Sequence, residues 1–254
     1  MTLEPDTNSR YSFVCESYLL RDMDGDILQC WHVLKAAHPG HAFLFMLDDY
    51  GQSCYTSMHA VDYHDLDDTE GQDLSHLPPD CFEDGEHKGY LSTPAELPFR
   101  MAAFYQRLAD VTMDDVMAKR ISLFGDPEEQ FNPIEAGRNL FAIMDEPHRV
   151  LKAPLAHGYE TVMVFPNGYF SDDLSPFENY VLAKHLEENF GYVLIGMGAS
   201  KLAYARTRAL DEPETRTLMD LLQSIYRDEF APARQDMLKQ AIGDNDILVL
   251  RYSE

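Results

Sequence analysis

The 254-residue chain is long enough to bury a sizeable hydrophobic core, as one large domain or as two small ones. Its composition, 45% hydrophobic and 25% charged, is ordinary for a globular protein and argues against wholesale disorder. No apolar run approaches the roughly 18 to 20 residues needed to span a bilayer, and residues 1–10 lack the features of a secretory signal. We therefore expect a cytoplasmic protein.

The charge is strongly acidic and unevenly distributed. The chain has 20 basic and 44 acidic residues, a net charge of −24, and residues 36–87 contain twelve acids but no lysine or arginine. Such a surface repels phosphate backbones and anionic lipids, so we expect neither direct nucleic-acid binding nor membrane binding. It attracts basic proteins and divalent cations, although solubility alone also accounts for it.

Residues 11–61 are predicted to form two antiparallel strand pairs. The segment 11–20 is rich in aromatic and β-branched residues, and 27–34 returns after a turn at 22–26 in which Gly25 supplies a positive φ. Segments 41–47 and 53–61 form the second pair around a turn at 48–51. The following segment, 62–90, has the composition of a long polar loop, either functional or disordered.

Helices are predicted to follow this loop. Thr93-Pro-Ala-Glu96 has the pattern of a capping box with proline at the first helical position, and the same pattern begins at Asp126, Asn132 and Ser175. The apolar spacing predicts helices over six segments: 94–109, 113–124, 133–144, 176–190, 213–229 and 232–242. Three further segments are predicted strands: 160–165, 192–197 and 246–252.

These elements predict an α+β fold. We expect an antiparallel sheet from the N-terminal third, helices packed on one of its faces, and a closing C-terminal strand. A single domain over residues 1–254 is the favoured organisation. The alternative is a β-rich acidic lobe, 1–92, and a helix-rich lobe, 93–254.

One candidate metal site comprises Cys30, His32, His38 and His41. Cysteine sulfur and histidine nitrogen suit zinc, and on a strand Cys30 and His32 would share one face. Histidines and aspartates in 59–68 could add ligands. The spacing matches no regular zinc motif, so surface and turn residues are the simpler interpretation. We expect no cofactor, with zinc as the alternative.

A glycine-containing turn offers a second candidate. Gly196-Met-Gly198-Ala-Ser-Lys201 follows an apolar segment and is predicted to precede a helix, which is the geometry of a phosphate-binding turn. Lys201 stands where the dinucleotide-binding pattern requires its third glycine, so a tight packing turn is the better interpretation. No common nucleophile motif is present, and the four cysteines are expected to be reduced thiols.

The first functional hypothesis is an inhibitor or adaptor that binds a protein with a basic surface. Immunity proteins and DNA-mimicking anti-defence proteins share this acidic composition. Carboxylates and aromatic rings both bind guanidinium groups, and the residues expected to do so are Tyr63, Asp65, Asp67, Asp68, Asp73 and Asp84. Two alternatives are a metal-dependent hydrolase that uses the His- and Asp-rich segment 30–68, and a non-catalytic subunit of a larger assembly.

Overall fold

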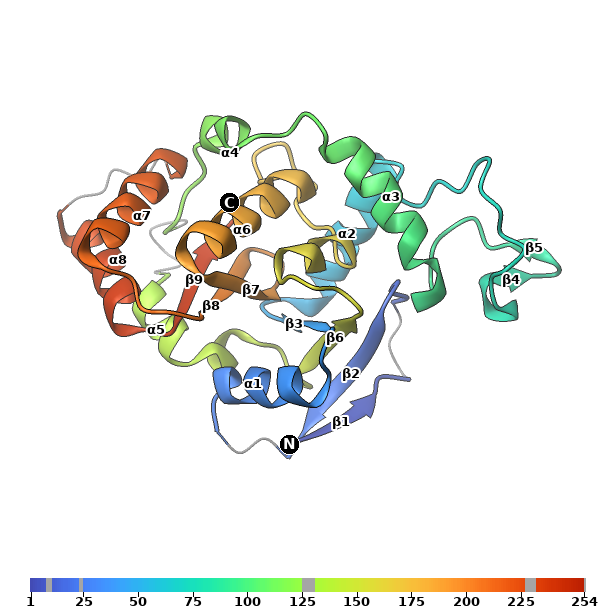
Figure 1. Cartoon of the computed structure of the whole chain (residues 1–254), viewed down its shortest axis with the longest axis horizontal. Coiled ribbons are helices and arrows are strands. Elements are labelled where there is room, and N and C mark those ends of the chain that lie inside the picture. Colours follow the sequence, from blue (N-terminus) through green and yellow to red (C-terminus); the bar gives the residue numbers. More distant parts are fainter. Residues whose placement is uncertain (8–10, 23–24, 125–130, 227–231, 254) are drawn as a thin grey trace.

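The computed structural model describes residues 1–7, 11–22, 25–124, 131–226 and 232–253 (Figure 1). Among these residues, no helix is both long and apolar enough to cross a membrane. The prediction of a helix start at Asp126 lies outside the described residues.

A seven-stranded mixed sheet forms the centre of the protein, with the strand order β1-β2-β6-β3-β7-β8-β9. Its strands are β1 (Thr2–Pro5), β2 (Glu16–Arg21), β3 (Ala42–Met46), β6 (Arg149–Ala153), β7 (Tyr192–Met197), β8 (Lys201–Arg206) and β9 (Ile247–Arg251). Only β3 and β7 pair in parallel; the other neighbours are antiparallel. The predicted α+β class is confirmed, as is a C-terminal strand at the sheet edge.

The origin of the strands differs from the prediction of a sheet built by the N-terminal third. Strands β6 to β9 all follow residue 148, and β6 inserts between β2 and β3. Residues from both predicted lobes therefore alternate within one sheet.

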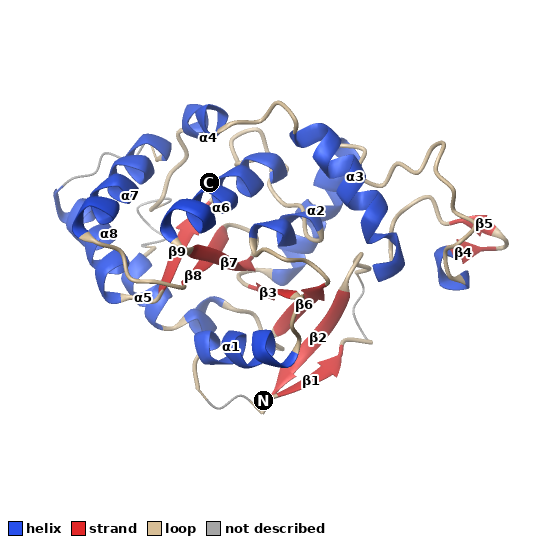
Figure 2. Cartoon of the chain, in the orientation of Figure 1, coloured by secondary structure: helices blue, strands red, loops and turns tan. Residues whose placement is uncertain are grey.

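Helices cover both faces of the sheet, so the prediction of helices on one face is wrong (Figure 2). The described residues form α1 (Ile27–Ala37), α2 (Tyr50–Tyr63), α3 (Leu97–Leu108), α4 (Met113–Lys119), α5 (Pro133–Arg138), α6 (Pro176–Phe190), α7 (Glu212–Ile225) and α8 (Pro232–Asp244). Phe43 and Phe45 of β3 pack with α1 and α5, whereas Leu44 and Met46 pack in the cluster that contains α3 and α6. A strand buried on both faces needs no polar alternation.

Two predicted strands, 27–34 and 53–61, are the helices α1 and α2. In α1 the buried residues Ile27, Cys30, Trp31 and Leu34 recur at helical spacing, and the Asp26 carboxylate accepts a hydrogen bond from Gln29 N at 2.8 Å. The Asp49 carboxylate caps α2 in the same way. Both predicted turns therefore end in helix caps rather than in returning strands.

Two predictions for the second half of the chain, a strand at 160–165 and a helix after Gly198, are also wrong. Most of the predicted helices, and the capping box at Ser175, are confirmed. The predicted strand 160–165 is largely a 3₁₀ helix, Tyr159–Met163, and β8 occupies the place of the helix expected after Gly198. Strand β7 and the helices α3, α6, α7 and α8 lie close to their predicted positions. Ser175 forms the predicted capping box with Glu178 at the start of α6.

The acidic segment 67–90, which we call the acidic arm, projects away from the body of the protein (Figure 1). It contains a short 3₁₀ helix, Pro79–Cys81, and a hairpin of β4 (Phe82–Glu83) and β5 (Glu86–His87). Asp84 and Gly85 both have positive φ, as a two-residue type I′ turn requires. The His87 ring of β5 lies 2.8 Å from the buried Glu96 carboxylate, so this pair joins the hairpin of the arm to the start of α3.

Candidate functional site

The predicted metal ligands do not converge. Because α1 is a helix, Cys30 and His32 point in different directions: Cys30 is buried in the core and His32 is exposed. The His38 and His41 rings lie 6.3 Å apart, and His38 also packs against Phe43. The described part of the chain contains no group of three or more His, Cys, Asp or Glu residues placed to hold a metal ion.

All four cysteines are free and buried. Burial raises the pKa of the Cys54 thiol to about 12 and also raises the pKa of the Cys15, Cys30 and Cys81 thiols. These groups therefore remain protonated at neutral pH, and their environment is that of structural thiols rather than of an activated nucleophile.

The predicted binding residues fall into two groups. Tyr63, Asp65, Asp67 and Asp68 lie together at the end of α2, whereas Asp73 and Asp84 lie out along the acidic arm. Asp65 pairs with Arg107 at 3.0 Å, and Asp67 pairs with the buried Arg100. These two carboxylates are thus occupied within the chain, while Asp68, Asp73 and Asp84 are exposed.

Exposed aromatic side chains form a continuous surface on α2 and the segment that follows Asn167. We call it the aromatic surface. Its members are the exposed residues Tyr55, Met58, Tyr63, Tyr169 and Phe170, together with the half-buried His59. The His59 ring lies 4.3 Å from the Tyr55 ring and 5.1 Å from the Tyr169 ring, and Tyr63 meets Tyr169 at 6.3 Å. Tyr63 is 72% exposed and Met58 is 56% exposed, which is unusual for such large apolar groups.

A groove of about 560 Å³ joins the aromatic surface to the base of the acidic arm. Met58, His59 and Asp62 of α2 line it, together with Tyr90 from the end of the acidic arm. The groove also contains the Arg100–Asp67 pair, in which Arg100 donates a further hydrogen bond to Leu66 O at 3.2 Å. This groove, which we call the α2 groove, therefore combines aromatic walls with carboxylates.

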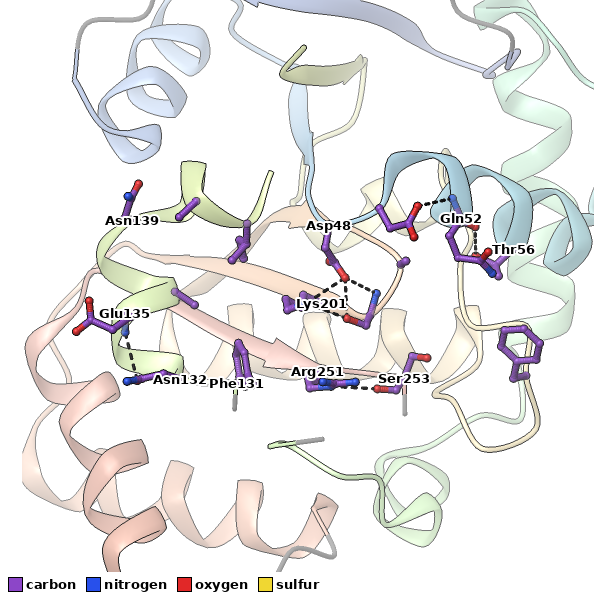
Figure 3. A pocket seen from close by; sticks show the side chains of 17 residues that line it. Asp48, Gln52, Thr56, Phe131, Asn132, Glu135, Asn139, Lys201, Arg251 and Ser253 are labelled. Atoms are coloured by element: carbon purple, nitrogen blue, oxygen red, sulfur yellow. Dashed lines mark hydrogen bonds and ion pairs between the residues drawn. The ribbon is translucent and has the colours of Figure 1, made fainter. Parts of the chain in front are cut away.

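A separate cavity of about 680 Å³ lies at one end of the strands of the central sheet (Figure 3). Strands β3, β7 and β9 all run in the same direction, so their carboxyl ends lie on the same side of the sheet, next to this cavity. Ligands of open α/β sheets bind in crevices outside strand carboxyl ends, which makes this strand-end cavity a second candidate site. Its residues are Asp48, Asp49, Gln52, Thr56, Phe131, Asn132, Glu135, Ala136, Asn139, Ala142, Ile143, Phe170, Ala199, Ser200, Lys201, Arg251 and Ser253.

Asp48 organises the floor of this cavity. Its Oδ2 atom accepts hydrogen bonds from Ser200 Oγ at 2.7 Å, from Ser200 N at 3.1 Å and from Lys201 Nζ at 3.1 Å (Figure 3). Gly198 permits this close approach, because a Cβ at that position would lie 2.6 Å from Asp48 N. Arg251 lies beside Lys201 on the neighbouring strand and donates to Ser253 O at 3.3 Å.

Sequence reasoning missed this cavity because its residues come from distant turns. Asp48 was interpreted as part of a hairpin, and the glycine turn was expected to lead into a helix. The one available signal was the position of Lys201 in the glycine-containing turn.

No family model, no curated protein and no solved structure matches this chain.

Proposed function

We propose that the chain is a binding protein, an inhibitor or adaptor, whose partner carries a basic surface segment. The observation that carries this proposal is the continuity of the aromatic surface, the α2 groove and the acidic arm. Exposed apolar side chains in contact with one another are typical of protein-interaction surfaces.

The chemistry of this surface favours arginine as the residue it binds. Guanidinium groups stack on the faces of tyrosine rings and pair with carboxylates. Tyr63 and Tyr90 are exposed rings, and Asp62 and Tyr90 both line the α2 groove. The Arg100–Asp67 pair in the same groove is an internal example of this pairing.

The acidic arm supports the encounter rather than the final contact. Residues 67–90 carry eight acids and one lysine, and the arm extends from the body of the protein. The electrostatic field of like-charged residues accelerates association with an oppositely charged partner, and salt weakens this field. Affinity then depends on the aromatic surface, because buried aromatic and arginine contacts dominate binding energies.

Binding of fluorescently labelled nona-arginine at low and high salt tests this proposal. The arm variant is D68N/D73N/D84N, in which each asparagine keeps a hydrogen-bond acceptor at an exposed position. We expect about a tenfold lower association rate at low salt, and little difference at high salt. The aromatic variant Y63A should raise Kd about two- to fivefold through faster dissociation.

The matched control is E188Q/E212Q/D220N, which removes three exposed charges from α6 and α7, away from the arm (Figure 1). It should leave the association rate close to that of the wild type. Equal association rates in the arm variant and the control would contradict the proposal. An equal reduction in both would show that association reflects total charge alone, and rates equal to that of the wild type would show that the arm carboxylates do not contribute. An unchanged Kd in Y63A would exclude the aromatic surface from the contact.

A further inference from the structure

We infer that Arg107 of α3, which pairs with Asp65, occupies a site that receives an arginine of the basic partner, and that the partner displaces Arg107 when it binds. The inference rests on the proposed function. It adds the Asp65 carboxylate to the contact and identifies an internal competitor for that carboxylate. Removal of the competitor should therefore strengthen binding.

The segment that follows α2 holds the Arg107 guanidinium by two acceptors. Arg107 donates from Nε to His64 O at 3.0 Å and from Nη2 to the Asp65 carboxylate at 3.0 Å. The backbone of this segment is fixed, because His64 N donates to Ala60 O and Asp65 N donates to Asp62 O, both at 3.2 Å. A carbonyl and a carboxylate placed in this way match the planar fork of a guanidinium, so the site is preorganised for arginine.

The same arrangement recurs two residues further along the chain, around Arg100. Arg100 donates from Nε to Leu66 O at 3.2 Å and from Nη2 to the Asp67 carboxylate. Arg100 and Arg107 are about two helical turns apart on α3, so one face of α3 carries both guanidinium groups. Because two arginines are bound in the same way, the segment 64–67 itself has the geometry of an arginine-binding site.

The two pairs differ in how easily they exchange. The Arg107 and Asp65 side chains are 40% and 68% exposed, whereas those of Arg100 and Asp67 are 5% and 21% exposed. Exposed ion pairs contribute little net stability, because water and salt compete for both charges. A partner's arginine can therefore replace Arg107 at small cost, whereas displacement of Arg100 would leave its buried charge uncompensated.

The exposed pair lies beside the aromatic surface. Tyr63 is 72% exposed and precedes Asp65 by two residues, and its ring lies 4.9 Å from the His64 ring. Guanidinium groups also stack on tyrosine rings, so neighbouring arginines of one basic segment can contact Tyr63 and Asp65 together. Asp65 thus extends the aromatic surface with a carboxylate.

Binding of fluorescently labelled nona-arginine at low salt tests the inference. R107Q removes the competitor and should lower Kd about three- to tenfold. The matched control is R216Q on α7, which also removes one exposed arginine and releases its exposed carboxylate partner, Glu212. R216Q should lower Kd less than about twofold, because only total charge changes there. Equal Kd values in R107Q and R216Q would overturn the inference.

A double-mutant cycle identifies the carboxylate that receives the arginine. The tighter binding of R107Q should be lost in D65N/R107Q, because the asparagine carries no charge to pair with a guanidinium. D65N alone should change Kd less than about twofold, since Arg107 occupies Asp65 in the wild type. Tighter binding that persists in D65N/R107Q would overturn the inference.

The arginine Nε–H signals of the isotope-labelled wild type report displacement directly. Saturating nona-arginine should shift the Arg107 signal and leave the Arg100 signal in place, and an unmoved Arg107 signal would overturn the inference. The arm variant and Y63A, measured in the same assay, test the proposed function separately. If they weaken binding as expected while R107Q equals R216Q, only the present inference fails; if neither weakens binding, the proposed function fails.

Discussion

At the residue scale, Glu96 is a fully buried carboxylate that fastens the acidic arm to the body. It accepts hydrogen bonds from Ser92 N and Thr93 N, both at 2.9 Å, and pairs with the His87 ring at 2.8 Å. Burial alone would raise the pKa of Glu96. The hydrogen bonds outweigh burial and hold this pKa below its ordinary value of 4.5.

The substitution E96Q should lower the free energy of unfolding by about 1–3 kcal/mol at pH 7, because it removes hydrogen bonds to a charged group. A lowered folded-state pKa means that the stabilisation is complete above the unfolded value of about 4.5 and is lost as the pH falls through the folded value. Urea unfolding of both proteins between pH 7 and pH 3 measures the difference, which should shrink with acidification.

The exposed variant E188Q is the control for this measurement and should change stability by less than about 0.5 kcal/mol. A difference between E96Q and the wild type that stays constant with pH would show that shape, rather than charge, accounts for the effect.

The same residue illustrates what the sequence could predict. The capping box of Thr93 and Glu96 was recognised because its signal is local: two residues three positions apart. The pairing of Glu96 with His87 was not recognised, because it depends on the path of the arm between them. The Asp65–Arg107 and Asp67–Arg100 pairs were missed for the same reason, since their partners are more than thirty residues apart.

At the element scale, the N-terminal segments 27–34 and 53–61 were mistaken for strands. The turn signals at 22–26 and 48–51 predicted returning strands there, but the buried residues of α1 follow a helical period and aspartates cap both helices. This error also supported the zinc hypothesis, because Cys30 and His32 share a face only on a strand. Tyr63, in contrast, was predicted as a binding residue and is highly exposed on α2, although its role stays a prediction.

The hairpin of the acidic arm depends on the backbone freedom of Gly85, whose φ is +86°. The substitution G85A should destabilise this hairpin by about 1 kcal/mol, because the left-handed conformation is costly with a side chain. Hydrogen exchange at Lys88 N, which donates to Cys81 O at 3.2 Å, should then accelerate about fivefold.

The control is G51A, in the first turn of α2, where φ is not positive and the nearest side-chain atom lies 3.8 Å away. It should leave exchange in the arm unchanged. Equal exchange at Lys88 in G85A and the wild type would indicate that the turn does not limit the order of the arm.

At the scale of the whole molecule, the acidic arm and the strand-end cavity present their charged groups in two different ways. The acidic arm and the aromatic surface face solvent, whereas Lys201 and Arg251 are withdrawn into a cavity at the ends of the strands. The sequence predicted the first arrangement from the base-free segment 36–87. It could not predict the second, because the cavity exists only where strands from both parts of the chain meet.

The central claim is that the acidic arm and the aromatic surface bind a basic protein. Affinity capture from the native lysate tests it most directly, with the wild type, D68N/D73N/D84N and E188Q/E212Q/D220N immobilised in parallel at low and high salt. The wild type and the control should retain a common basic protein at low salt, and the arm variant should retain much less of it. Equal retention of the same proteins by all three, or retention that is insensitive to salt, would contradict the claim.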